Sequence, residues 1–325
     1  MPTPCRRAAR AVLALAAGLT AALVEGQAPA ATGATAAAEL TEADRWVQVL
    51  QETLAAARSG DLGTSGGHLA AAERLLDEGG WPRVSAPHQR WLLAAGRIRQ
   101  AQTDLGDARR YFERAVSREP AWAEAWMALG TIFETIAQLP DTRLAVRLQT
   151  DRGVFERTRR AEVTAQARRC YREALEARPG LHEARLRLGH VLQLRGETAA
   201  ARTELERVAA GGAPDDLRYL ARLFLGDLAE ARRDWAGAVA HYRAAVELEP
   251  QAISARLALS ASRGLADDPA AATHEALTVL EMRGADPERD PWWTYLRPGR
   301  HQVAAALSAL RQEVAGRPLS GGVAP

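Results

Sequence analysis

The residue types that most often carry chemistry are sparse in this chain and lack the spacing that chemistry needs. Residues Gly63 to Gly67 read G-T-S-G-G and match the G-x-S-x-G pattern around the serine nucleophile of many hydrolases. That pattern requires a strand before the serine, whereas the segment before Gly63 is predicted to be helical. We therefore interpret Ser65 as part of a glycine-rich loop, and a hydrolase acting through Ser65 is the remote alternative.

Neither a reactive thiol nor a metal site is indicated. Cys170 has no histidine close in sequence to activate it, so a small, partly buried residue in a helix pair is the simpler interpretation. The histidines are scattered, and the sequence has no H-E-x-x-H, C-x-x-C or Asp-rich calcium loop. Four carboxylates at predicted inter-helix turns are interpreted as helix-start residues: Asp215, Asp216, Asp267 and Asp268. We expect no enzyme activity, no catalytic residue, no metal and no cofactor.

The first 30 residues have the pattern of a cleavable secretory signal. Three arginines are followed by an apolar stretch of 14 residues, Ala11 to Val24, and then by small side chains at Ala28 and Ala30. This stretch is shorter than the roughly 20 residues of a membrane-spanning helix, so a retained anchor is the alternative interpretation. We expect an exported chain, periplasmic or secreted, whose mature part begins with a linker at 31–40.

Charge narrows the class of partner. The chain has 42 basic and 40 acidic residues, of which three and one lie in 1–30, so the mature chain carries 39 of each. A nucleic-acid-binding protein normally carries a basic excess, so nucleic acid is not an expected partner. The hydrophobic content of 47%, with Ala and Leu prominent, is typical of a packed helical protein. Only Cys170 remains after signal removal, and we expect no internal disulfide.

The most informative feature is a pattern of side-chain size that recurs about every 34 residues. Two series share identical spacings: Gly96, Ala108, Phe112, Ala115 and Pro120, and Gly226, Ala238, Tyr242, Ala245 and Pro250. A third copy starts at Gly189, and a fourth is divided between 126–133 and 167–179. Units begin near 89, 123, 182, 219 and 253, and an insertion at about 137–161 interrupts the second unit.

This pattern resembles the tetratricopeptide repeat family, whose W-x2-L-G-x2-Y, A-x3-F and terminal Pro signature is matched most fully from Trp126 to Pro179. The resemblance covers 89–285 and implies an all-α fold, an α-solenoid of helix-turn-helix repeats in a right-handed superhelix with a concave groove. We expect the glycine of each first helix to face the alanine of the second, with the aromatic residue beside that contact. Residues 41–88 are predicted to form a degenerate pair, with helices at Glu42–Arg58 and His68–Asp77.

Two further segments each have two interpretations. The insertion 137–161 is an added helix or a mobile arm, and its arginines indicate either a basic partner-binding element or a solvated helix face. The segment 286–315 carries Trp292, Trp293 and Tyr295 and is predicted to cap the last repeat, with a helix at about 303–314. An exposed aromatic docking patch is the alternative for it. Residues 316–325 are expected to form a loose tail.

The resemblance also implies that positions 2, 5, 9 and 12 of each unit line the groove. These positions give the candidate partner-binding residues: Arg90, Leu93, Arg97, Gln100, Glu124, Met127, Thr131, Glu134, Glu183, Leu186, His190, Gln193, Leu223, Asp227 and Glu230. An exposed polar residue is the simpler interpretation of His190. Arg97 stands where relatives that bind chaperone tails carry Asn, and the chain has no Lys, so that activity is not expected.

These features predict a non-enzymatic protein–protein interaction scaffold or adaptor in the bacterial cell envelope, which binds a partner polypeptide in its groove. The alternative is a structural subunit of an envelope secretion, pilus or polysaccharide-export assembly, in which the chain associates with itself. No stable membrane span is expected once the signal is removed.

Overall fold

The computed structural model describes residues 42–78, 86–138, 160–282, 290–296 and 307–312, and every regular element in these ranges is helical. Residues 307–312 also form helical turns. The labelled helices are α2 (Glu42–Arg58), α3 (Leu62–Glu78), α4 (Ala86–Ala101), α5 (Leu105–Arg118), α6 (Ala123–Gln138), α8 (Arg160–Ala177), α9 (His182–Leu194), α10 (Thr198–Ala209), α11 (Asp215–Glu230), α12 (Trp235–Leu248), α13 (Ile253–Leu265), α14 (Pro269–Glu281) and α15 (Pro291–Leu296).

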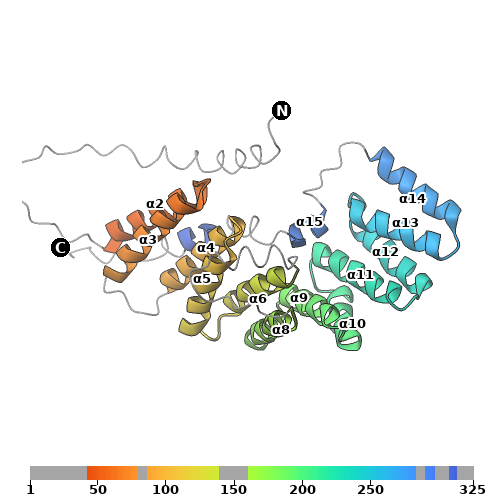
Figure 1. The fold of residues 1–325 in the computed structure, drawn as a ribbon, viewed down its shortest axis with the longest axis horizontal. Coiled ribbons are helices and arrows are strands. Elements are labelled where there is room, and N and C mark those ends of the chain that lie inside the picture. The colour runs from red at the N-terminus through yellow and green to blue at the C-terminus, as the bar shows by residue number, and fades with distance from the viewer. Residues whose placement is uncertain (1–41, 79–85, 139–159, 283–289, 297–306, 313–325) are drawn as a thin grey trace, which may run out of the picture. The chain divides into compact units, whose positions relative to one another are not determined.

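From α2 to α14, packing follows chain order (Figure 1). In the described ranges, successive helices pair into six hairpins: α2 with α3, α4 with α5, α6 with α8, α9 with α10, α11 with α12, and α13 with α14. From α4 onward, the second helix of each hairpin also contacts the first helix of the next hairpin. The first helices α4, α6, α9 and α11 contact one another in that order. This nearest-neighbour packing is that of an all-α solenoid.

The recurring glycines mark the closest contacts within the hairpins. Each lies against the side chain that follows the recurring alanine of the second helix by four residues. A Cβ placed on the glycine would lie 2.3–2.7 Å from that side chain: Gly96 against Phe112, Gly130 against Tyr171, Gly189 against Leu205 and Gly226 against Tyr242. The nearest neighbour of each glycine is therefore this larger side chain, which was expected to lie beside the contact; at Gly189 the carbonyl oxygen of Ala201 also lies 3.5 Å from the added Cβ. The larger side chain itself crosses the hairpin and covers the glycine.

Aspartates begin three of the second helices in the same way. Asp104, Asp234 and Asp268 each accept a hydrogen bond from the backbone N–H three residues later, at 2.9–3.1 Å. The residue before each aspartate has a positive φ, between 59° and 64°. Asp268 is thus a helix cap as predicted, and Asp267 supplies the preceding left-handed residue. At the turn between α10 and α11, Asp215 and Asp216 lie in the first turn of α11, where negative charges interact favourably with the helix dipole.

The N-terminal pair forms with α2 at the predicted bounds, but α3 begins six residues earlier than expected. Residues 63–67 therefore lie in a helix, and their interpretation as a loop was wrong. Asp61 explains the early start, because its Oδ1 accepts the N–H of Thr64 at 2.8 Å. Ser65 is fully buried and pairs with Gln102 at 3.1 Å. Without a preceding strand or an exposed hydroxyl, Ser65 has neither feature of the hydrolase pattern.

α15 packs mainly on the first helices, although Asp290, just before it, accepts the N–H of Ser254 at the start of α13. α15 contacts α11, and Tyr295 on α15 reaches residues of α6 and α9. Leu277 and Leu280 of α14 are 52% and 76% exposed, so the residues that the structure describes provide no cap over these positions. The capping prediction was wrong for α15 because its aromatic rings find buried partners on the first helices instead.

Several expectations lie outside the described residues. They are the signal and linker at 1–40, the body of the insertion at 139–159 and the tail at 316–325. Among the described helices, none is both long enough and apolar enough to cross a membrane.

Candidate partner-binding site on the first helices

The fifteen candidate residues, which we refer to as the first-helix face, lie on α4, α6, α9 and α11. None of them is exposed. Eight are buried and seven are half-buried. The buried residues are Arg97, Gln100, Met127, Thr131, Glu134, Leu186, His190 and Leu223. The apolar members among these belong to the hydrophobic core, which removes them from direct contact with a partner in this state.

Polar members of the first-helix face are brought together into a buried cluster around Glu134. His190 Nδ1 lies 2.6 Å from Oε1 of Glu134, and Arg187 donates to Oε2 at 3.1 Å. Tyr171, from the second helix α8, donates its hydroxyl to Oε2 at 2.6 Å. Tyr295, from α15, donates to Oε1. We call Glu134, Tyr171, Arg187, His190 and Tyr295 the Glu134 cluster.

The position of His190 corrects the sequence interpretation. It was expected to be an exposed polar residue, but it is 8% exposed and stacks on the ring of Phe224 with centroids 4.5 Å apart. Its ring also meets that of Tyr295 edge-on at 5.5 Å. The residue is buried because aromatic side chains of two other helices, α11 and α15, close around it.

The Glu134 cluster holds its carboxylate in the charged form. Burial alone would raise the pKa of Glu134, but the positive charge of Arg187 and hydrogen bonds from His190 and Tyr171 outweigh it and lower the pKa to about 2. Burial would likewise lower the pKa of Arg187, and the carboxylates Glu183 and Glu134 raise it well above its usual value. The core of the site is thus a buried ion pair between Glu134 and Arg187, in which both oxygens of the carboxylate accept hydrogen bonds.

A second set of buried polar contacts continues onto the neighbouring first helix α4. Arg97 donates to Gln100 at 2.8 Å, and Gln100 donates to Thr131 of α6 at 3.1 Å. Burial lowers the pKa of Arg97 to about 10, although Glu183 acts in the opposite direction. Since even this pKa is far above neutral, Arg97 carries a buried positive charge on the first-helix face.

At the other end, Asp227 of α11 accepts the hydroxyl of Tyr242 at 2.7 Å, and burial raises the pKa of Asp227. Glu230 accepts a hydrogen bond from Ser262 of α13. Outside these groups, Glu124 pairs with Arg178, and Arg90 lies over the ring of Trp122 at 5.5 Å. Each of these candidate residues therefore contacts a side chain of its own hairpin or of the next hairpin along the chain.

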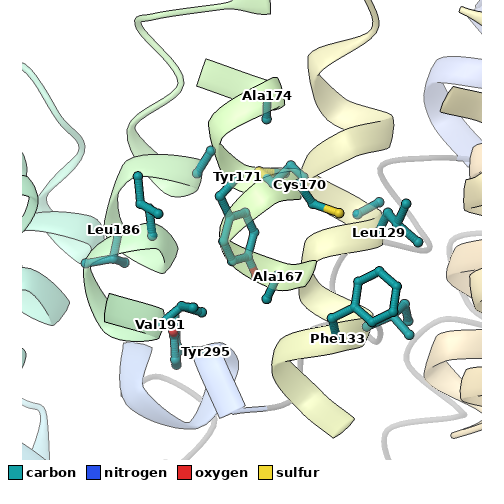
Figure 2. Close-up of a cluster of buried hydrophobic side chains, with 14 of the residues drawn as sticks. Leu129, Phe133, Ala167, Cys170, Tyr171, Ala174, Leu186, Val191 and Tyr295 are labelled. Atoms are coloured by element: carbon teal, nitrogen blue, oxygen red, sulfur yellow. The ribbon is translucent and has the colours of Figure 1, made fainter. Parts of the chain in front are cut away.

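α15 supplies the site residues that the repeat pattern did not predict. Tyr295 is 4% exposed, and its ring lies 4.5 Å from the guanidinium carbon of Arg187 and 5.3 Å from the ring of Phe224. Figure 2 shows Tyr295 on α15 among the buried side chains that also include Tyr171. The sequence signal for this contact is the aromatic cluster at 292–295, for which the repeat pattern predicts an end cap.

The described part of the chain holds neither a reactive thiol nor a cluster of metal ligands. Cys170 is buried on α8 beside Tyr171 (Figure 2), and burial raises the pKa of its thiol to about 12, so it is protonated at neutral pH. In the ranges that the structure describes, no three His, Cys, Asp or Glu side chains converge as metal ligands would.

Comparison with solved structures identifies the fold. A tetratricopeptide repeat protein from Parabacteroides merdae ATCC 43184 matches with a TM-score of 0.53 and 15% identity, over 83% of this chain and 90% of that chain. MamA from Desulfovibrio magneticus RS-1 matches with a TM-score of 0.46 and 19% identity, over 62% and 97% of the two chains. YrrB, a TPR protein with an unusual peptide-binding site, matches at 0.43 and 14%, over 74% and 97%.

No protein-family model and no curated protein matches the sequence. The last two structural likenesses lie below a TM-score of 0.5, so the assignment depends on the first of the three and on the repeating hairpins described above. The chain is an α-solenoid with the fold of a tetratricopeptide repeat protein.

Proposed function

We propose that this protein is a non-enzymatic scaffold that binds a segment of a partner polypeptide on its first-helix face. The observation that carries the proposal is that this face already holds a short polypeptide segment, α15, through buried polar and aromatic contacts. A surface made of ordered helices, with charged and aromatic anchors from several repeats, suits the binding of a short helix or extended strand.

We further propose that the scaffold acts in the bacterial cell envelope. The support is the arginine-rich start, the apolar stretch and the small residues near Ala30. Residues 1–35 fused to alkaline phosphatase, an enzyme that becomes active only after export, are expected to give active enzyme in bacterial cells. Replacing Leu13, Leu15 and Leu19 with Glu is expected to abolish that activity. Equal activity with and without these replacements would contradict an exported location.

Site-directed photocrosslinking in the producing cell tests the binding face. A benzophenone amino acid replaces Leu93 or Gln193, which are half-buried residues of the first-helix face. The matched controls are Arg169 and Arg207, whose side chains are 76% and 57% exposed on second helices. We expect a crosslinked polypeptide from Leu93 and Gln193 and none from the two controls. Equal crosslinking from both pairs, or none from the first, would contradict a partner site on this face.

The same experiment separates the scaffold from its main alternative. If the crosslinked band contains only peptides of this chain, the protein associates with itself, as the structural subunit of an envelope assembly would. If it contains a second polypeptide, the adaptor proposal is supported. A hydrolase through Ser65 has no structural observation in its favour, because Ser65 is buried inside α3.

A further inference from the structure

Tyr295 is a deeply buried side chain that holds α15 on the first helices. Tyr295 places its hydroxyl against Glu134 of α6 and 2.7 Å from Nδ1 of His190 on α9. The ring lies under the guanidinium of Arg187 and against Phe224 of α11. A single side chain from a six-residue helix therefore touches three successive first helices.

Two further side chains of the same short stretch complete the attachment. Trp292 contacts Phe224 with ring centroids 5.6 Å apart and stacks beside Tyr295 at 6.2 Å. Asp290, 3% exposed, accepts hydrogen bonds from the Tyr219 hydroxyl at 3.0 Å and from the N–H of Ser254 at 2.9 Å. The neighbouring Trp293 is 41% exposed and has no ring contact within the described residues.

This attachment has the character of a bound peptide. All three anchors lie within six consecutive residues and follow the pattern Asp-Pro-Trp-x-x-Tyr. Their receptors come from four different helices of the stack, α6, α9, α11 and α13. A tethered segment is present at a high effective concentration, on the order of millimolar, so even a weak intrinsic affinity keeps it in place.

We propose that α15 is a built-in occupant of the partner site, and that the partner displaces it with the same chemistry: a short helical turn carrying an acidic residue, a tryptophan and a tyrosine in the spacing Asp-Pro-Trp-x-x-Tyr. The inference depends on the scaffold function proposed above and adds the kind of segment that is recognised. The Tyr295 hydroxyl is the selective contact, because Oε1 of the buried Glu134 accepts a hydroxyl that phenylalanine lacks, and His190 Nδ1 lies 2.7 Å from that hydroxyl.

The test uses the full mature chain and a fluorescein-labelled synthetic peptide with the sequence of residues 288–298, followed by fluorescence anisotropy. The variant Trp292→Ala/Tyr295→Ala frees the site in the chain. We expect this variant to bind the peptide at least about ten-fold more tightly than the wild type, because the tethered competitor is removed. Trp293→Ala, which alters an exposed residue of the same helix, is the matched control and is expected to bind like the wild type.

Peptide variants test the chemistry of the anchors. On the freed chain, replacing the tyrosine of the peptide with phenylalanine or its aspartate with asparagine is expected to weaken binding by about ten-fold, since each leaves a buried polar partner without its hydrogen bond. Replacing the exposed tryptophan with alanine is expected to have no effect. Equal binding of all these peptides would overturn the assigned contacts.

Circular dichroism and thermal unfolding establish that the freed chain is folded, and Tyr295→Phe provides a milder opening if the double variant unfolds. A folded variant that does not bind the peptide overturns the proposal. A wild-type dimer that becomes a monomer in Tyr295→Phe also overturns it, because α15 would then join two copies of the chain. If the peptide fails while Leu93 still crosslinks to a second polypeptide in the cell, this inference falls and the scaffold function stands.

Discussion

Gly226→Ala is expected to destabilise the protein by about 3 kcal/mol. The added Cβ would lie 2.3 Å from Cε1 of Tyr242, a ring that is fully buried and cannot move aside without shifting α12. In an unobstructed helix the same change would stabilise by about 1 kcal/mol, because alanine is the better helix former. The sign of the effect in urea-induced unfolding therefore distinguishes a steric contact from a propensity effect.

Gly180→Ala is the control for this prediction. A Cβ at Gly180 would have no atom within 4 Å, so its unfolding free energy is expected to match that of the wild type or to rise slightly. Gly226→Ala is expected to cost less in a Tyr242→Ala background than in the wild type, since the ring that the added Cβ would meet is absent there. If Gly226→Ala were as stable as Gly180→Ala, the close contact between α11 and α12 would be refuted.

Arg187→Met is expected to cost about 3–5 kcal/mol, because it leaves the carboxylate of Glu134 buried without its ion-pair partner. The double variant Glu134→Gln/Arg187→Met removes both charges and is expected to recover a large part of this loss. Arg207→Met is the surface control. The side chain of Arg207 is 57% exposed, and ion pairs on the surface, such as its pair with Glu204, contribute about 0–1 kcal/mol to stability. A loss no larger than that of Arg207→Met would contradict a buried ion pair.

The pH dependence of the unfolding free energy is a second, independent test of the buried Glu134–Arg187 ion pair. The pKa of Glu134 is about 2 in the folded chain, below its ordinary value of 4.5. Because the folded pKa is depressed, the stabilising contribution is fully present above pH 4.5 and is lost as the pH falls through 2. In Arg187→Met the positive charge that lowers this pKa is removed, so the folded and unfolded pKa values of Glu134 come closer together. We therefore expect the stability of the variant to fall less steeply between pH 4.5 and pH 2 than that of the wild type.

Local sequence patterns predicted the helices and closest contacts of the repeat units well. The bounds of α2 were predicted to the residue, and the glycines at 96, 130, 189 and 226 were correctly placed at the closest helix contacts. Both depend on short-range features: helix periodicity, and a side-chain size that must be minimal where two helices approach. The early start of α3 was missed because the capping role of Asp61 was overlooked, although a local signal for it exists in the sequence.

The candidate site was predicted less completely. The sequence placed Glu134 and His190 on one face from their unit positions, but it gave no reason to expect them to be 2.6 Å apart. They lie 56 residues apart in sequence, and Tyr171 and Arg187 join them from two other positions on α8 and α9. Such a cluster depends on how successive hairpins are rotated against one another, which no local pattern specifies.

By itself the sequence determined that this chain is helical, repetitive and built of hairpins with glycine at their closest contacts, because each of these properties arises between residues near in the chain. Only the tertiary structure decided that Tyr295 lies against Glu134, 161 residues away, and not over the last hairpin. That outcome is set by competition between two surfaces for the same aromatic side chains. The first helices prevail because they offer a buried carboxylate, a guanidinium and an aromatic ring together, whereas Leu277 and Leu280 of α14 stay exposed.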